Sequence, residues 1–215
     1  STSRRQRQMC IRDRNEQVKG EEFEPTERIK VYILEVKDTP KGPRILLSRT
    51  HPGLVKRLFE SEVAEVKDGT VEIKSIAREA GSRTKIAVWS NDPDVDPVGA
   101  CVGMNGARVN SIVEELRGEK IDIINWDENP AILIENALSP AKVIAVMADP
   151  DEKTALVVVP DYQLSLAIGK EGQNARLAAR LTGFKIDIKS ETQARESGDF
   201  DSVSYTHLTL PTTSR

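Results

Sequence analysis

The sequence contains two Gly-x-x-Gly corners that could bind a phosphate group. The first is Gly-Met-Asn-Gly at 103–106 and the second is Gly-Lys-Glu-Gly at 169–172. Glycine reaches positive φ and lets another backbone approach closely, because it has no Cβ. A helix that begins at such a corner turns its free N–H groups and the positive end of its dipole toward it, which suits an anion. The chemistry on offer is therefore noncovalent phosphate binding.

Each corner is flanked by segments with the pattern of short helices. The apolar residues after the first corner are spaced i, i+3, i+4 and i+7, as on one helix face: Val109, Ile112, Val113 and Leu116. After the second corner, Leu177, Ala178 and Leu181 share a face. The preceding segments, 97–102 and 162–168, also favour short helices. Each corner is therefore predicted to join two helices in a tight turn.

The corners belong to a duplicated module. Each is followed, after its helix, by an identical Lys-Ile-Asp-Ile segment, at 120–123 and at 185–188. The two corners and the two strands are offset by nearly the same number of residues. A lone Gly-x-x-Gly has little value as a signal, whereas two copies in register indicate an internal repeat.

The remaining pattern predicts the elements around the corners. We expect helices over 51–66 and from an Asn129-Pro130 cap to 138, with strands at 71–75, 84–89, 119–126, 142–148 and 154–159. Upstream, strand-like segments at 28–36 and 44–49 flank a turn at 38–43 and should leave their edges exposed. The link between the modules, 126–129, is short, and we expect it to fix one module against the other.

This order of helix, strand, strand, helix, corner, helix and strand resembles the type II KH domain, whose loop clamps the backbone of RNA or single-stranded DNA. Longer stretches, over roughly residues 28–190, are similar to the tandem KH region of the NusA family of bacterial transcription factors. These stretches are Ser-Asn-Asp-Pro at 90–93, Asp-Pro-Val-Gly-Ala-Cys-Val-Gly at 96–103, Arg-Gly-Glu-Lys-Ile-Asp-Ile at 117–123 and Leu-Ala-Ile-Gly-Lys at 166–170.

The resemblance implies an α+β fold: two tandem type II KH domains, each a three-stranded sheet packed on helices, preceded by a remnant of an OB-type barrel. The expected divisions are a disordered or foreign tail (1–24), the last strands of the barrel (25–50), the first KH domain (51–128), the second KH domain (129–190) and a second disordered or foreign tail (191–215). The tails are polar and lack apolar periodicity, so a cloning origin and a natural flexible tail both stay open. The earlier barrel strands are missing, so we expect a fragment of a longer protein.

Composition narrows the class of protein. The formal net charge is −3 over 215 residues, but the charge is unevenly distributed, since five arginines lie in the first 14 residues. The global charge therefore does not predict nucleic-acid binding, and only local patches of charge could. Cys10 and Cys101 make no disulfide framework, which fits a reducing, cytoplasmic setting, and we expect Cys101 in the core. We expect neither a membrane span nor a signal peptide.

The resemblance implies a non-enzymatic protein that binds single-stranded RNA and modulates RNA polymerase pausing, termination and antitermination. The implied partners are nascent RNA, RNA polymerase and other elongation or antitermination factors, with no membrane, cofactor, catalytic residue or metal, and the chain is expected to be a monomer. The predicted RNA-binding residues are Gly103, Met104, Asn105, Gly106, Arg108, Gly169, Lys170, Glu171, Gly172, Gln173, Arg176 and Arg180. Val102 and Ile168 should form apolar floors for bases, and the aromatic content of 4% argues against an aromatic stacking platform.

Other readings stay open. Lys170 could be an ordinary surface lysine, and Arg176 and Arg180 a solvated helix face. The first corner has no cation of its own, so it could bind more weakly or depend on Arg83 and Lys85. A nucleotide-hydrolysing loop is disfavoured because Gly169-Lys170 lacks the upstream glycine and the following hydroxyl. A histidine-based active site is also disfavoured, because the two histidines, His51 and His207, lie near predicted loops or tails. A KH-fold protein-interaction scaffold without RNA binding is the alternative.

Overall fold

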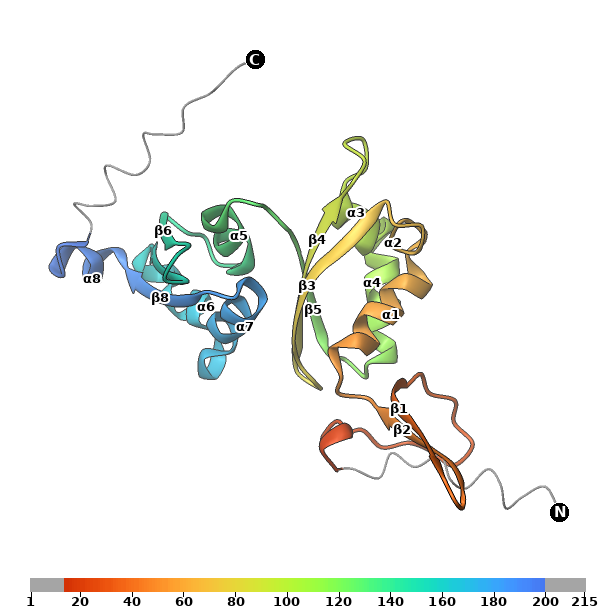
Figure 1. Cartoon of the computed structure of the whole chain (residues 1–215). Coiled ribbons are helices and arrows are strands. Elements are labelled where there is room, and N and C mark those ends of the chain that lie inside the picture. The colour runs from red at the N-terminus through yellow and green to blue at the C-terminus, as the bar shows by residue number, and fades with distance from the viewer. Residues whose placement is uncertain (1–13, 200–215) are drawn as a thin grey trace. The chain divides into compact units, whose positions relative to one another are not determined.

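The computed structural model describes residues 14–199, and the chain divides into two compact units between Ile123 and Ile124. Figure 1 colours the chain from its N-terminus to its C-terminus. The first unit holds a two-stranded hairpin followed by an α/β module, and the second unit holds another α/β module. The last strand of the first module, β5 (Lys120–Asn125), crosses the boundary.

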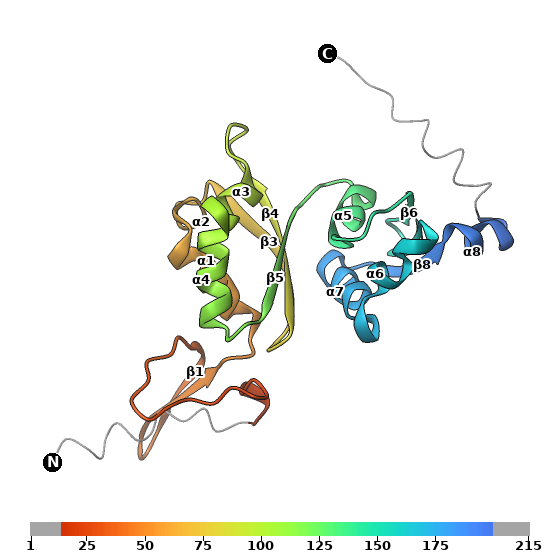
Figure 2. The same cartoon turned by 180° about the vertical axis from the view of Figure 1, so that it is seen from behind.

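The hairpin consists of β1 (Tyr32–Thr39) and β2 (Gly42–Ser48), which pair antiparallel as a two-stranded sheet. Figure 2 shows this ribbon from behind. Ile33 and Val36 are 57% and 59% exposed, so the hairpin presents apolar side chains to solvent. The predicted pair of strands is confirmed, with β1 starting later than expected, and the turn predicted over 38–43 shortens to residues 40–41 because both strands extend into it. Their origin in an OB-type barrel stays a prediction.

Residues 14–24 were predicted to be part of a disordered or foreign tail. The structure contradicts disorder for this segment, and a foreign origin stays a prediction. A 3₁₀ turn, η2 (Arg14–Glu16), opens the described chain, and Val18 is 7% exposed because it packs on the backbone of Gly81. Arg49, itself 1% exposed, donates from Nη2 to Glu21 Oε1 at 2.6 Å. One valine and one ion pair to a distant residue leave no periodic pattern in the sequence. Residues 1–13 lie outside the described part.

The first module has a three-stranded sheet in the order β3–β4–β5, with β3 and β4 antiparallel. Its elements are α1 (Pro52–Glu62), α2 (Ala64–Lys67), β3 (Val71–Glu79), β4 (Arg83–Ser90), α3 (Pro97–Val102), the 3₁₀ turn η3 (Met104–Gly106), α4 (Ala107–Glu115) and β5. The helix predicted over 51–66 breaks at the fully buried Val63, whose backbone is extended (φ −116, ψ 108). In Figure 1, α1 and α4 cover one face of the sheet, and Val55, Phe59 and Ile112 are among the residues of their shared core.

The second module repeats this order, with its sheet arranged β6–β7–β8. Its elements are α5 (Pro130–Ala137), β6 (Ala145–Asp149), β7 (Thr154–Val159), the 3₁₀ turn η4 (Asp161–Gln163), α6 (Leu164–Ile168), the 3₁₀ turn η5 (Lys170–Gly172), α7 (Gln173–Thr182), β8 (Lys185–Ser190) and α8 (Glu191–Glu196). β6 and β7 are antiparallel, and β7 and β8 are parallel. The Asn129 cap is confirmed, since its side chain accepts from the Ala131 N–H at 3.0 Å.

Helix α8 corrects the second predicted tail, which was expected to start at 191. Ser190 and Gln193 form a capping box, and Ala194 is fully buried. The Ser-x-x-Gln pattern that defines such a box was visible in the sequence and could have located this helix. Residues 200–215 lie outside the described part.

In the first module, a buried ion pair holds the turn between α4 and β5. Glu119 is 1% exposed and accepts from Arg78 Nε at 3.1 Å, from the Gly81 N–H at 2.7 Å and from Thr84 Oγ1 at 2.8 Å. A buried carboxylate is tolerated only when it is paired and hydrogen-bonded, which these donors achieve.

Candidate nucleic-acid interface

The two corners have the same backbone conformation. Their first glycines, Gly103 and Gly169, have φ/ψ of 75/174 and 77/172. The third residues, Asn105 and Glu171, are left-handed at 52/27 and 54/26. The closing glycines follow with φ values of 76 and 74. The repeat seen in the sequence therefore extends to the dihedral angles of the loop.

Both first glycines are required by space as well as by φ. A Cβ on Gly103 would lie 2.8 Å from Cγ of Arg108, and a Cβ on Gly169 would lie 2.8 Å from the backbone N of Asn174. Such distances are below van der Waals contact, and the positive φ already disfavours a side chain. The glycines are therefore needed for the shape of the loop itself.

The loops are open to solvent and lead directly into helices. Met104 is 85% exposed, and Asn105, Lys170 and Glu171 are also exposed. The residues that cap α4 and α7 are glycines, which have no side chain to accept from the N–H groups of the first turn. The N–H groups of the capping glycines and of Ala107 and Gln173 donate to carbonyl oxygens of the preceding 3₁₀ turns. An anion at either corner would therefore interact with the helix dipole and with N–H groups further into the first turn.

Arg108 is bound within the first module. Its Nη1 donates to the carbonyl oxygen of Ala100 at 2.7 Å and to Glu65 Oε2 at 2.9 Å, and its alkyl chain covers Gly103. These bonds tie the end of α3 to α2 and hold the corner from behind. An RNA contact by Arg108 stays a prediction, and it would compete with Glu65 for the guanidinium.

Asn174 takes the matching place in the second module, five residues after the first glycine, and sequence reasoning missed it. It is 3% exposed, and its Nδ2 donates to the carbonyl oxygens of Ala167 at 2.9 Å and Leu138 at 3.1 Å. The amide thus joins the ends of α5 and α6 behind the loop. The only signal was its alignment with Arg108, because asparagine by itself does not indicate a buried role.

The remaining cations of the second module lie on α7. Arg176 is exposed, and its Nη1 donates to the carbonyl oxygen of Glu171 at 3.0 Å, so it supports the loop. Arg180 is exposed one turn further on, and Gln173 begins the helix. The structure therefore places Lys170 in the loop, Gln173 and Arg176 in the first turn of α7 and Arg180 in its last turn. Contact of these residues with RNA stays a prediction.

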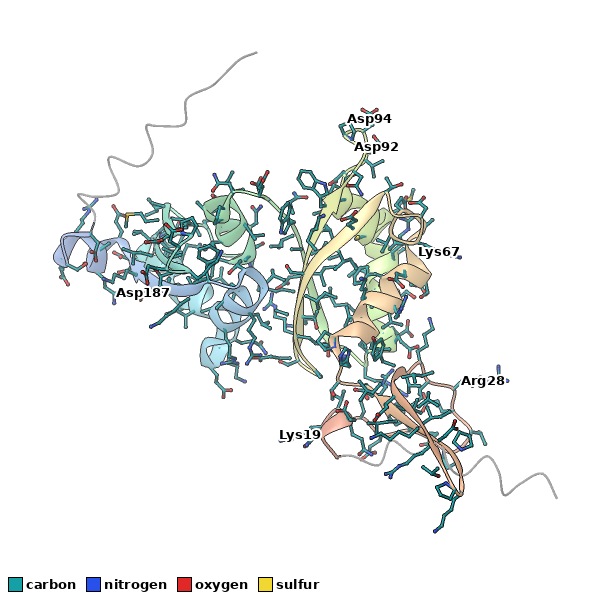
Figure 3. All side chains as sticks on the ribbon, viewed as in Figure 1. Lys19, Arg28, Lys67, Asp92, Asp94 and Asp187 are labelled. Atoms are coloured by element: carbon teal, nitrogen blue, oxygen red, sulfur yellow. The ribbon has the colours of Figure 1, made fainter. Side chains whose placement is uncertain are left out.

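Arg83 and Lys85, the two cations named as an alternative source of charge for the first corner, are both paired with a carboxylate. Arg83 donates from Nε to Asp122 Oδ2 at 2.7 Å, and Lys85, which is fully buried, donates to the same oxygen at 2.9 Å. Burial lowers the pKa of Lys85. The matching aspartate of the second Lys-Ile-Asp-Ile segment, Asp187, is exposed (Figure 3). In the first module, these two cations are therefore already paired with Asp122 of the same module.

The apolar residues next to the corners differ in their exposure to solvent. Cys101 is fully buried, and burial raises the pKa of its thiol to about 11, so its core position is confirmed. Ile168 is 38% exposed, and Val102 is half-buried.

Among residues 14–199, no group of three or more His, Cys, Asp or Glu side chains is arranged to hold a metal ion. Within the same range, every helix is too short or too polar to span a membrane.

A three-stranded sheet packed on helices, with a Gly-x-x-Gly corner between two of those helices, occurs twice in the element order of a type II KH domain. The chain is therefore a tandem KH protein. Family models agree: residues 49–126 match the NusA-like first KH domain, and residues 130–196 match the NusA-like second KH domain. The chain belongs to the NusA family, which consists of transcription factors rather than enzymes.

Curated relatives named transcription termination/antitermination protein NusA are similar over most of the chain. The Bacillus subtilis protein is 66% identical over 184 residues, which are 86% of this chain and 50% of that protein. The Mycobacterium tuberculosis protein is 56% identical over 82% of this chain and 51% of its own length. The Thermus thermophilus protein is 50% identical over 82% of this chain and 46% of its own length. The chain thus spans about half the length of these relatives.

Proposed function

We propose that this chain binds single-stranded RNA through its two Gly-x-x-Gly loops. The observation that carries the proposal is the identical backbone of two solvent-exposed corners, each capped by glycine at the start of a helix. Each corner offers backbone N–H groups to a phosphate, and KH domains bind nucleotide backbones through this loop. The second corner adds Lys170, with Arg176 and Arg180 on the following helix.

The binding gains from the linkage of two modules. One helix terminus contributes only about 0.3–1 kcal/mol to the binding of an anion, so a single corner should bind weakly. Only residues 127–129 separate the two matched KH domains. A short link raises the effective concentration of the second site, which can increase affinity by roughly 100-fold or more.

The names of the relatives support a role in transcription termination and antitermination. In this role the RNA is a nascent transcript, and the partners are RNA polymerase and other elongation or antitermination factors. We propose that the chain acts as a monomer in the bacterial cytoplasm. The proposed consequence of RNA binding is modulation of RNA polymerase pausing, termination and antitermination.

A salt series with a short single-stranded RNA and the full chain tests RNA binding. The informative variant is Gly172→Asp, because a Cβ there comes no nearer than 3.9 Å to another group, whereas Gly169→Asp would strike the backbone of Asn174. The aspartate places a negative charge where the phosphate is proposed to lie. We expect weaker binding and a shallower dependence of log K on log salt, because fewer counterions are released.

Gly183→Asp is the matched control. Gly183 caps the other end of α7 with φ 75 and has open space around it, so this variant has the same charge and backbone strain away from the loop. It should bind RNA like the unmodified chain. Equal binding by Gly172→Asp and Gly183→Asp would contradict the loop as the RNA site and favour a protein-interaction scaffold.

A further inference from the structure

The turn before α6 is anchored on both sides of Tyr162. Asp161 accepts from the Thr192 N–H at 3.1 Å and from Thr192 Oγ1 at 2.6 Å, which ties the turn to the start of α8. Gln163 Oε1 accepts from the Lys142 N–H at 3.0 Å, which ties it to the segment before β6. The backbone that bears Tyr162 is therefore held in place by its two neighbours.

Tyr162 itself points into solvent. Its side chain is 77% exposed, which makes it the most exposed aromatic residue among residues 14–199. A scattered surface hydrophobe needs no explanation, but this ring is not alone. Leu166 is 44% exposed one helical turn later, and Lys170 of the loop is exposed four residues after that.

These three residues form a row in the sequence, at four-residue intervals toward the corner: Tyr162 in η4, Leu166 in α6 and Lys170 in η5. Because η4 runs directly into α6, Tyr162 and Leu166 share a helix face, about 6 Å apart along the axis. Gly169, with φ/ψ of 77/172, ends α6, and Lys170 follows it in the loop. The row offers an aromatic ring, an aliphatic side chain and then a cation. That sequence of chemistry suits a strand of bases and phosphates better than it suits a purely apolar protein partner.

The first module lacks this row. Its matching positions are Asp96, Ala100 and Met104. Asp96 caps α3, with its carboxylate accepting from the Gly99 N–H at 3.1 Å. The second module also has a carboxylate at this turn, Asp161, so what distinguishes it from the first module is the aromatic ring of Tyr162 and the cation of Lys170.

We propose that Tyr162 stacks on a base of the single-stranded RNA whose phosphate lies at the 169–172 corner, with Lys170 contacting the backbone between them. This inference rests on the proposed RNA binding and adds a base contact to it. Stacking on an aromatic ring tolerates any base, because every base has a π face. The single tyrosine therefore adds affinity without fixing the sequence, although the chain as a whole is poor in aromatic residues.

The test compares Tyr162→Ala and Tyr162→Phe in the full chain, by fluorescence anisotropy with a labelled oligoadenylate. We expect binding about tenfold weaker for Tyr162→Ala and within twofold of the unmodified chain for Tyr162→Phe, because phenylalanine keeps the ring face. Ile132→Ala is the matched control, since Ile132 is an apolar residue of α5 that is 40% exposed. The salt slope should not change in Tyr162→Ala, and Lys170→Gln should reduce it by about one phosphate contact.

An abasic oligomer of the same length separates stacking from other roles. Tyr162→Ala should cost nothing on the abasic backbone, whereas Gly172→Asp should weaken binding to both oligomers. Equal loss from Tyr162→Ala and Tyr162→Phe, or unchanged oligoadenylate binding by Tyr162→Ala while Gly172→Asp binds weakly, would overturn the stacking proposal alone. Unchanged binding in both Tyr162→Ala and Gly172→Asp would overturn RNA binding at this corner as well.

Discussion

The two modules share one loop backbone and differ in nearly every side chain around it. The first corner exposes Met104 and is held from behind by Arg108, which binds Glu65. The second exposes Lys170 and is held by the buried amide of Asn174. The comparison separates two requirements: glycines at fixed positions determine the shape of the loop, and the neighbouring side chains determine how much charge it presents to a ligand.

The same contrast occurs in the core. The residue before Lys-Ile-Asp-Ile is Glu119 in the first module and Phe184 in the second. Glu119 is buried against Arg78, whereas Phe184 is 6% exposed with Lys153 Nζ lying 5.0 Å from its ring centroid. One structural position is thus filled by an ion pair in one copy and by an aromatic ring in the other.

The largest expected effect comes from breaking the ion pair. Glu119→Ala leaves Arg78 buried without its carboxylate and should destabilise the first module by about 3–5 kcal/mol. The double variant Arg78→Met, Glu119→Leu should recover part of that loss, because no unpaired charge remains, although the Gly81 N–H and the Thr84 hydroxyl lose their acceptor. Urea unfolding followed by amide exchange of β3 to β5 measures both. A double variant as unstable as Glu119→Ala would show that the cost does not arise from an unpaired charge.

The next largest effect should come from replacing the first glycine of each corner with alanine, and the loss of stability should differ between the two modules. The φ/ψ values of Gly103 (75/174) and Gly169 (77/172) lie in a region that is essentially limited to glycine, so this backbone conformation should cost each variant about 1–3 kcal/mol. At Gly103 the new Cβ meets the flexible chain of Arg108, but at Gly169 it meets the backbone of Asn174, which cannot move aside. Overpacking should therefore add about 1–3 kcal/mol for Gly169→Ala. Thermal unfolding checks the order, and equal costs would mean that the two corners are packed alike.

Removal of the residues behind the corners should have a smaller effect. Asn174→Ala leaves the buried carbonyls of Leu138 and Ala167 without this donor and should cost about 1–3 kcal/mol. Arg108→Met removes an ion pair whose partners are each about a third exposed, so about 1 kcal/mol or less is expected. Chemical denaturation of the two variants compares them, and a larger loss for Arg108→Met would reverse our view of the two clamps.

The smallest effect concerns the anchored turn that the second module has before α6. Hydrogen bonds from Thr192 lower the pKa of Asp161 below its ordinary value of 3.8. The folded state is therefore stabilised fully above pH 3.8, and this contribution is lost as the pH falls through the lower folded pKa. Hydrogen exchange and the chemical shift of the Thr192 amide should therefore change only at acidic pH, where Asp161 becomes protonated. Asp161→Asn should remove that acid transition, and a transition that persists in this variant would assign it to another group.

The sequence was sufficient for the repeat, the element order and both corners, because helical periodicity, glycine pairs and the Asn129 cap are local signals. It was not sufficient for Val18 and Glu21, whose partners are Gly81 and Arg49, far along the chain. Arg108 illustrates the same limit within the site. Its charge suggested an RNA contact, but the packing that brings Glu65 to it follows from the break between α1 and α2, and no local pattern shows that break.

Chemical-shift mapping of the full chain with a short single-stranded RNA tests the central claim most directly. If two corners of identical backbone bind one kind of ligand, the amides of 103–108 and of 169–174 should both shift as RNA is added, with the shifts at the second corner reduced more by salt. Shifts confined to other surfaces, with both corners unchanged, would contradict the account.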